Sequence, residues 1–368
     1  MTAWRRDLHA HPETAYEEHR TSQFVADKLQ DFGLEVVRGL AGTGVVGVLK
    51  GKGEGGAIGL RADMDALDIH EQSNRPYASR TPGKMHACGH DGHTAIGLGI
   101  ARELDDNGGF DGTLKLFFQP AEEGGRGGKP MSETELLDDV DRMLALHLGL
   151  GEETGTVVAG YDRPLSNAKL DVAFHGVPAH AGGQPHAGRN AAQALGAAIQ
   201  NLYSIPRHGD GKTRVNVGQV HSPNAQNVIS ERADFRVEVR GETAELNEYM
   251  LEKARRVVEH AAGMHDCEHE SALYGKTTTF ECDDSMVDAV SDAAAGVEAV
   301  TNVKRRKEFG GSEDASYLIR RVQEAGGDAT YIGIGASNPA GHHTAYFDID
   351  EASLDVGVDV TCETIRSL

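Results

Sequence analysis

The chain has 368 residues, of which 39% are hydrophobic, so it is long enough for two packed domains. No apolar run approaches the roughly 20 residues of a membrane span, and a formal net charge of −21 argues against binding to nucleic acid or to anionic membranes. The charged N-terminal segment contains no signal-peptide h-region, so we expect a cytoplasmic protein.

Acidic residues are spread along the chain, as in "ELDDNGGFDG" and "SETELLDDVDR". On a folded protein this pattern predicts a halophilic source, because high salt screens the self-repulsion. The four cysteines form no Cys-x-x-Cys pair, and Cys267, Cys282 and Cys362 are expected to be ordinary thiols. Cys88 differs from them because histidines surround it.

The first part of the chain alternates between helix and strand patterns. An amphipathic helical pattern runs from Arg5 to Phe32 and ends at Gly33. A second helix is predicted from about Thr94 to Asp106, and strands are predicted over 33–37, 42–51, 57–62, 112–119 and 141–149. Strands that alternate with helices favour an α/β sheet, in which ligands bind beyond the carboxyl ends of the strands.

The middle of the chain has a different order of elements. From about Ala168 to Lys276 the patterns follow β-α-β-β-α-β, the order of a ferredoxin-like sandwich. The α/β pattern then returns and ends in a helix from about Asp350. The sequence therefore predicts an α/β domain, residues 1–167 and 277–368, that is interrupted by an inserted α+β domain, residues 168–276.

Cys88 and His90 lie in the segment "KMHACGHDGHTA". In an extended segment, residues two apart point the same way, so both side chains could reach one cation. Thiolate and imidazole suit Zn²⁺ and related divalent metals. The alternative is an ordinary polar loop that enters a buried helix, and this pair alone does not exclude it.

Glu122 and Glu123 directly follow the apolar run "LKLFF". Adjacent carboxylates repel each other unless a cation or a proton neutralises one of them. One of the pair could then bind a metal while the other acts as general base. In a chain this acidic, a solvated turn is the competing interpretation.

Two further histidines and two aspartates follow apolar runs. His147 ends "LALHLG", and His343 lies in "AGHHTAYFDID". Taken singly, the first could be a satisfied core histidine and the second part of a polar turn. Asp63 and Asp65 in "RADMDAL" could orient ligand imidazoles from behind.

Taken together, these residues place ligand-type side chains at four predicted strand ends, which would converge on one edge of the sheet. Five candidate ligands and one further carboxylate are more than a single closed tetrahedral metal site uses. They suit a two-metal hydrolytic centre. No GxSxG elbow, Walker A motif or helical HExxH is present. A nucleophilic dyad of Cys88 with a histidine would leave the glutamate pair unexplained.

Motifs over nearly the whole chain resemble the aminoacylase/carboxypeptidase G superfamily of two-metal peptidases. The segments "WRRDLHAHPE", "RADMDALD", "ACGHDGHTA", "QPAEEG", "GVPAHAGG" and "AGHHTAYFDID" carry this resemblance. Within the superfamily the chain resembles the branch of auxin-conjugate hydrolases and N-acyl amino acid amidohydrolases, and there the p-aminobenzoyl-glutamate hydrolase type. The resemblance implies an α/β two-metal peptidase (phosphorylase/hydrolase-like) catalytic domain and an inserted ferredoxin-like dimerisation domain.

The resemblance also implies roles for individual residues. It implies two divalent cations per chain, Mn²⁺ or Zn²⁺, with Cys88 bridging them and these ligands in all: Cys88, His90, Glu123, His147 and His343. Glu122 corresponds to the general base, and His180 to a histidine that reaches the partner subunit's active site and stabilises the oxyanion. Asn227 and Arg240 correspond to residues that hold the substrate carboxylate. Without the family, His180 would be a surface-loop residue and Arg240 an outward residue of a strand.

The implied activity is hydrolysis of an N-acyl amino acid, with p-aminobenzoyl-glutamate as the favoured substrate. A general deacylase or an auxin-conjugate-type hydrolase is the alternative, and a catalytically silent, metal-buffering subunit is the interpretation from another class. A homodimer is expected, or a heteromer with a related second subunit. The chain departs from the family in its short leading helix, its acidity and its compact connection between the strands predicted over 33–37 and 42–51. Because this connection is compact, the resemblance does not determine which acyl group the substrate carries.

Overall fold

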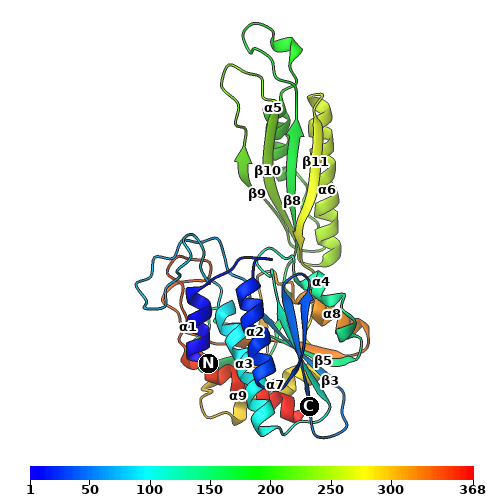
Figure 1. The fold of residues 1–368 in the computed structure, drawn as a ribbon. Helices are drawn as coiled ribbons and strands as arrows, with labels where there is room; N and C mark the ends of the chain where they lie inside the picture. The colour runs from blue at the N-terminus through cyan, green and yellow to red at the C-terminus, as the bar shows by residue number, and fades with distance from the viewer. The chain divides into compact units, whose positions relative to one another are not determined.

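The computed structural model describes residues 1–368 and divides into two compact units (Figure 1). The first, here called the α/β unit, comprises residues 1–163, 280–309 and 314–368. The second, the sandwich unit, comprises residues 164–279 and 310–313. The predicted boundaries at 168 and 276 lie a few residues inside these limits.

The α/β unit contains an eight-stranded mixed sheet in the order β1-β2-β4-β3-β5-β14-β6-β12. Its central strands β4, β3, β5 and β14 run parallel, and β1 and β2 are antiparallel at one side. The strands are β1 Glu35–Leu40, β2 Gly44–Lys50, β3 Ala57–Asp63, β4 Thr113–Gln119, β5 Val140–Leu148, β6 Thr156–Val158, β12 Asn302–Lys304 and β14 Asp328–Ile334. A separate short pair joins β7 Tyr161–Asp162 to β13 Lys307–Glu308.

Helices cover both faces of this sheet, with α1, α2, α3 and α9 gathered on one side and α4 and α8 on the other in Figure 1. They are α1 Thr2–Ala10, α2 His19–Asp31, α3 His90–Asn107, α4 Gly128–Ser132, α7 Asp284–Gly296, α8 Ser316–Glu324 and α9 Ala352–Ser367, with a 3-10 turn at Glu135–Leu137. All of β3 is buried, which explains its unbroken apolar pattern. Helix α3 is buried over most of its length, and a Cβ at Gly97 would lie 2.9 Å from the Phe118 ring, so the helix packs closely on the sheet.

The sandwich unit is an antiparallel sheet in the order β11-β8-β10-β9, with α5 and α6 packed on one face (Figure 1). Its elements are β8 Ser166–His175, α5 Ala191–Tyr203, β9 Thr213–His221, β10 Arg232–Gly241, α6 Ala244–Met264, β11 Glu268–Lys276 and a 3-10 turn at Pro185–Ala187. Alternate residues of β8 and β10 are buried, as a sheet with one covered face requires. Asn190 and Thr243 cap the two helices with their side chains. The ferredoxin-like order expected from the sequence is confirmed.

Two predicted helices differ from the structure. The single helix expected from Arg5 to Phe32 is wrong: α1 ends at Ala10 and α2 begins at His19. The break coincides with Pro12, which disfavours a helical conformation at the residue before it. The helix expected from Thr94 begins at His90, because Gly89 has φ +95° and ends the preceding loop in the left-handed region.

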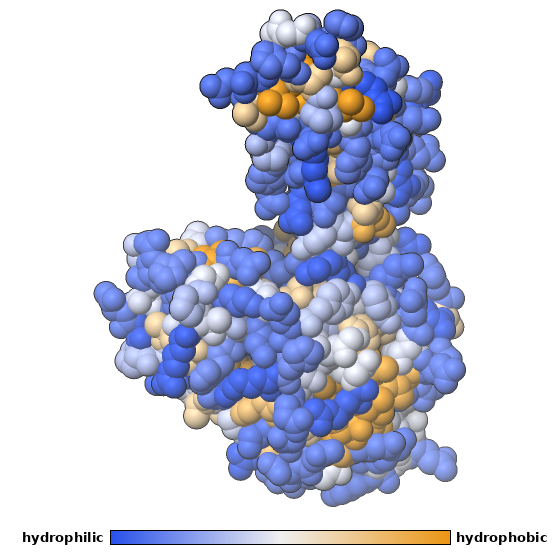
Figure 2. Space-filling model, turned by 45° about the horizontal axis from the view of Figure 1, so that its top comes forward, coloured by the Kyte–Doolittle hydropathy of each residue, from blue (hydrophilic) through white to orange (hydrophobic).

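The visible surface is mainly hydrophilic (Figure 2). Large exposed apolar side chains are few, and five of the six belong to the sandwich unit: Tyr203, Val220, Val228, Met264 and Leu273, with Tyr346 in the α/β unit. No helix is both long and apolar enough to cross a membrane.

Candidate metal centre

The five predicted metal ligands come from four segments of the α/β unit. Glu123 follows β4, and His147 is the last residue but one of β5. Cys88 and His90 are not at a strand end as expected: Cys88 precedes α3, and His90 is its first residue. His343 lies nine residues beyond β14, in a loop where it adopts φ +61°. The sheet edge therefore supplies only part of the site, and a helix N-terminus and a loop supply the rest.

Side-chain atoms of these residues meet in overlapping clusters. Within each cluster all candidate ligand atoms lie within 4.8 Å of one another. The clusters are Cys88 with His90 and His147; Cys88 with Glu123 and His343; and His90 with Glu122 and Glu123. Cys88 belongs to two of them, with its Sγ 3.6 Å from His147 Nε2, and Glu123 Oε1 lies 3.3 Å from His343 Nε2. The overlap of the clusters makes these residues a candidate set of metal ligands.

The atoms at the centre fit metal cations. His90 Nδ1 lies 2.8 Å from the Asp65 carbonyl oxygen, which can only accept a hydrogen bond, so Nδ1 carries the proton. His90 Nε2 is buried without a hydrogen-bond partner, and the nearest partner of the buried Glu123 Oε1 is His343 Nε2 at 3.3 Å. His147 Nδ1 likewise donates to the Leu148 carbonyl over 2.8 Å, which turns its Nε2 toward Cys88. Buried nitrogen and oxygen atoms of this kind fit a cation, which would take their lone pairs.

Burial controls the protonation of this centre. Burial, with Glu123 nearby, raises the pKa of the Cys88 thiol well above its usual value. Burial also holds the pKa of His147 well below its usual range, assisted by His93. Burial opposes the charge on His90, but Asp63 and Cys88 outweigh it and raise the pKa of His90. A bound cation would reverse this balance, because it requires a thiolate and a neutral imidazole.

Asp65 holds the turn that carries the glutamate pair. Its two carboxylate oxygens accept hydrogen bonds from the backbone nitrogens of Glu122 and Glu123, at 3.0 and 2.9 Å. Its carbonyl oxygen also accepts from His90. Asp65 thereby contacts the general-base candidate and two ligand candidates, and its hydrogen bonds to the glutamate backbone were not predicted from the sequence.

Asp63 supports the site through His93. His93 Nδ1 lies 2.6 Å from Asp63 Oδ1, and His93 Nε2 accepts a hydrogen bond from the Leu148 backbone nitrogen at 2.8 Å. Both ring nitrogens of His93 are therefore used. Arg61 Nη1 pairs with Asp63 Oδ2 at 2.7 Å, entirely inside the protein. His93 thus belongs to the scaffold behind His147.

A buried network beside this centre was not predicted from the sequence. Arg5 Nε pairs with Asp91 Oδ2 at 2.8 Å, and Arg5 Nη2 pairs with Asp348 Oδ1 at 2.8 Å. His9 Nδ1 lies 2.7 Å from the same Asp91 oxygen. Asp91 follows His90 in α3, and Asp348 follows the His343 loop. The motif "WRRDLHAHPE" contains Arg5 and His9, but no local pattern indicates partners more than 80 residues away.

In the sandwich unit, two predicted substrate-site residues are neighbours and one is not. His180 forms an isolated antiparallel β-bridge with Val228 through the backbone. The Ala181 backbone nitrogen donates to the Asn227 carbonyl at 3.0 Å. Arg240 lies at the other end of β10, opposite Asn167 and Arg214, and forms an ion pair with Glu238 at 3.0 Å. His180 and Asn227 therefore share one loop pair, and Arg240 is separate from them.

The imidazole of His180 has a defined tautomer. Its Nδ1 accepts hydrogen bonds from the backbone nitrogens of Gly182 and Gly183, at 3.1 and 2.9 Å. When the ring is neutral, the proton must therefore lie on Nε2. The exposed ring thus presents an N–H donor.

Comparisons with known proteins agree with this geometry. Residues 59–367 match the model of the Peptidase family M20/M25/M40. The chain is 38% identical to the indole-3-acetyl-aspartic acid hydrolase of Enterobacter agglomerans, covering 99% of this chain and 94% of the relative. It is 36% identical to a subunit of the p-aminobenzoyl-glutamate hydrolase of Escherichia coli K12, with the same coverage. Both alignments span 412 positions, so the relatives carry segments that this 368-residue chain lacks.

Solved structures show the same fold. The aminobenzoyl-glutamate utilization protein of Klebsiella pneumoniae is 34% identical, with a TM-score of 0.85 over 100% of this chain and 95% of that one. The YXEP protein of Bacillus subtilis, described as a dinuclear metal binding peptidase, is 27% identical, with a TM-score of 0.75 over 100% and 96%.

Proposed function

The chain belongs to the Peptidase family M20/M25/M40 and is a metal-dependent amidohydrolase, and we propose that it cleaves the amide bond of an N-acyl amino acid, with p-aminobenzoyl-glutamate as the first candidate substrate. One observation carries the proposal. Glu122 is not one of the five proposed ligands, but it lies beside His90 and Glu123. Its backbone nitrogen donates to Asp65, which also contacts those two residues. A carboxylate so placed is positioned for proton transfer.

Two divalent cations would be held by five residues, with the Cys88 thiolate able to serve both: Cys88, His90, Glu123, His147 and His343. Such cations would polarise the amide carbonyl and lower the pKa of water. The thiolate and imidazole ligands favour Zn²⁺, and the resemblance to the p-aminobenzoyl-glutamate hydrolase type favours Mn²⁺.

Glu122 is proposed as the general base. It takes a proton from the water that attacks the amide carbonyl carbon and passes that proton to the leaving amine nitrogen as the C–N bond breaks. The hydrogen bonds from the backbone nitrogens of Glu122 and Glu123 to Asp65 support the turn that carries this carboxylate.

The sandwich unit is proposed to complete the site of a second copy. His180 would donate its Nε2–H to the oxyanion, a role supported by the two glycine nitrogens that occupy its Nδ1. Asn227, on the adjoining loop, and Arg240 would bind the substrate carboxylate. We expect a homodimer, and the relative named as one subunit of a hydrolase supports a second subunit type as the alternative.

Two other substrate classes compete with p-aminobenzoyl-glutamate. The relative named indole-3-acetyl-aspartic acid hydrolase supports an auxin-conjugate-type substrate, and the wider family supports a general deacylase. We also propose a cytoplasmic protein from a high-salt source. The four cysteines are all free, as in a reducing compartment.

The test combines metal content with turnover. The protein is purified in high salt, its metals are counted by elemental analysis, and Mn²⁺ or Zn²⁺ is supplied. Release of glutamate from p-aminobenzoyl-glutamate is then compared with cleavage of indole-3-acetyl-aspartate and of N-acetyl and N-benzoyl amino acids. We expect about two metals per chain and fastest cleavage of the aminobenzoyl substrate. Cleavage of the other compounds alone would retain the mechanism and reject that substrate.

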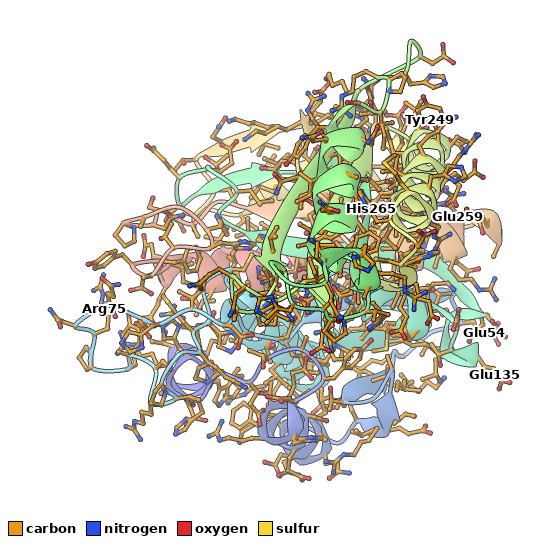
Figure 3. All side chains as sticks on the ribbon, turned by 90° about the horizontal axis from the view of Figure 1, so that it is seen from above. Glu54, Arg75, Glu135, Tyr249, Glu259 and His265 are labelled. Carbon is orange, nitrogen blue, oxygen red and sulfur yellow. The ribbon has the colours of Figure 1, made fainter.

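A Glu122→Gln variant separates an enzyme from a metal-buffering subunit. It should keep both metals and lose about 10²–10⁴-fold in kcat. Glu135→Gln is the matched control, because Glu135 is an exposed glutamate at the periphery of the α/β unit (Figure 3). Equal behaviour of the two variants would reject the assigned role.

Mixing His180→Ala with Glu122→Gln tests the shared site. If His180 acts across subunits, some mixed dimers contain one intact site, and partial activity should return. No recovery after proven subunit exchange would contradict the arrangement.

A further inference from the structure

Two side chains of the connection between α1 and α2, those of Tyr16 and Glu18, contact the turn that carries the glutamate pair. Glu18 stands at the N-terminus of α2, but its carboxylate does not cap that helix. Glu13 does so instead, accepting hydrogen bonds from the backbone nitrogens of Arg20 and Thr21 at 3.0 and 2.8 Å. The Glu18 carboxylate, which is fully buried, is thereby available for other contacts.

Glu18 binds the start of the turn that carries Glu122. Its Oε1 accepts hydrogen bonds from the backbone nitrogens of Ala121 and Tyr16, each at 3.0 Å. Its Oε2 accepts from the Thr43 hydroxyl at 2.5 Å. These three donors fill most of the acceptor capacity of the carboxylate.

Tyr16 binds the end of the same turn. Its hydroxyl donates to the Arg126 carbonyl at 2.6 Å, and the Arg126 guanidinium lies 5.2 Å from the centre of the tyrosine ring. Residues 121 and 126 are therefore both held by a segment more than 100 residues away in the chain. Glu122 and Glu123 lie between them.

The turn needs such support because its backbone is unfavourable. Ala121 has φ +55°, in the left-handed region that alanine rarely adopts. Arg126 and Gly127 both donate to the Ala121 carbonyl, at 3.2 and 3.0 Å, and a Cβ at Gly127 would lie 1.7 Å from the Pro120 carbonyl oxygen. A conformation of this kind persists where the surroundings hold it.

We propose that Tyr16 and Glu18 are positioning residues, which clamp the 121–126 turn so that Glu122 faces the reacting water and Glu123 faces the metal site. This inference rests on the proposed role of Glu122. It assigns a function to the break between α1 and α2, where the sequence pattern predicts continuous helix.

The experiment uses the full chain loaded with Mn²⁺ and the substrate that the wild type cleaves fastest. Glu18→Ala should lower kcat by about 10–100-fold, and Tyr16→Phe by roughly tenfold, with both metals retained and KM nearly unchanged. Glu18→Gln should restore most of kcat, because its amide oxygen can still accept from Ala121 and Thr43 can accept from its amide nitrogen.

Matched controls separate the clamp from general stability. Glu17→Ala changes the adjacent glutamate, whose side chain is exposed and pairs with Lys84. Tyr249→Phe removes a hydroxyl that also donates to a backbone carbonyl, that of Pro206, but on α6 in the sandwich unit (Figure 3). Both controls should keep the wild-type kcat.

Three results would overturn the inference. One is an unchanged kcat in Glu18→Ala and Tyr16→Phe while Glu122→Gln abolishes turnover. Another is a loss that matches a loss of bound Mn²⁺ or of melting temperature and nothing more. The third is a Glu18→Gln variant as impaired as Glu18→Ala. If Glu18→Ala does not fold, Tyr16→Phe decides, because it removes one hydroxyl only. Full turnover by Glu122→Gln would instead refute the proposed function itself.

Discussion

The α/β unit contains 24 Lys and Arg against 43 Asp and Glu, whereas the sandwich unit contains 12 against 14. Nearly all of the net charge of −21 thus belongs to the unit with the candidate metal centre. The interiors differ as well. The α/β unit buries several charged side chains, among them Arg5, Arg61, Asp63, Asp91 and Asp348, whereas Glu313 is the single buried charged residue of the sandwich unit and none is buried among residues 164–279.

This difference shows that buried charged groups, which have a high desolvation cost, are concentrated in the α/β unit. Burying a charge requires desolvation, and a buried ion pair seldom stabilises a protein more than packed apolar residues would. In the α/β unit the buried pairs lie beside the segments that carry His90, His147 and His343. Residues 164–279 of the sandwich unit contain no candidate metal centre. There, alternate apolar residues of the sheet pack against two helices.

Removing Arg5 should have the largest effect on stability. Arg5→Ala leaves Asp91 and Asp348 buried without this cation, so we expect a loss of about 3–5 kcal/mol in the free energy of unfolding, measured by urea titration. Arg236→Ala is the control from the sandwich unit, where the exposed pair with Asp171 spans 2.8 Å and contributes about 0–1 kcal/mol. Similar losses in both variants would contradict the contrast between the two interiors.

The stability contributed by His9 should depend on pH. Burial opposes its charge, but Asp91 and Glu71 outweigh burial and raise the pKa of His9 to about 9. Folded His9 therefore holds a proton that the unfolded chain releases near its ordinary pKa of 6.5. The stabilisation is complete below about pH 6.5 and is lost as the pH rises through about 9.

The difference in unfolding free energy between wild type and His9→Gln should accordingly shrink by on the order of 3 kcal/mol over that range. Urea titrations at several pH values measure it. His260→Gln, on the exposed side of α6, is the control for replacing a histidine. A difference that is constant with pH would show that His9 is not charged in the folded protein.

Asp63 should affect metal affinity without contacting the metal. Asp63→Asn weakens the hold on His93 and the scaffold behind His147, so we expect Mn²⁺ or Zn²⁺ to bind about 10–100-fold more weakly by calorimetric titration. Asp171→Asn in the sandwich unit should leave the affinity unchanged. If both variants bind as the wild type does, Asp63 does not support the site.

Salt should stabilise the α/β unit more than the sandwich unit. Screening relieves repulsion among its excess carboxylates, by on the order of 1 kcal/mol between low salt and molar salt. Trp4, the single tryptophan, lies in α1 and reports unfolding of the α/β unit by fluorescence. Hydrogen exchange of α6 and β10 reports the sandwich unit. An equal change in stability in both units would contradict the prediction, because it would show that net charge does not set the salt dependence.

Much of the architecture could be predicted from local pattern. The alternation in β8 and β10, the apolar run of β3 and the helical period of α6 each depend on which face of an element is buried, and that information is local. The resemblance to the two-metal peptidases predicted the family correctly, and it indicated which residues are candidate ligands. The expected helix from Arg5 to Phe32 was wrong because the amphipathic pattern continues on both sides of Pro12, while the chain between the two helices turns aside.

The sequence by itself determined the two-unit order of elements, the family and the residues available for a metal centre, because periodicity and motif spacing are properties of neighbouring residues. Only the tertiary structure decided that Cys88 Sγ lies 3.6 Å from His147 Nε2, that Asp65 holds both glutamates, and that Glu18 reaches Ala121. These contacts join residues 57 to 103 positions apart. Their geometry depends on how strands, helices and loops pack, which no local pattern contains.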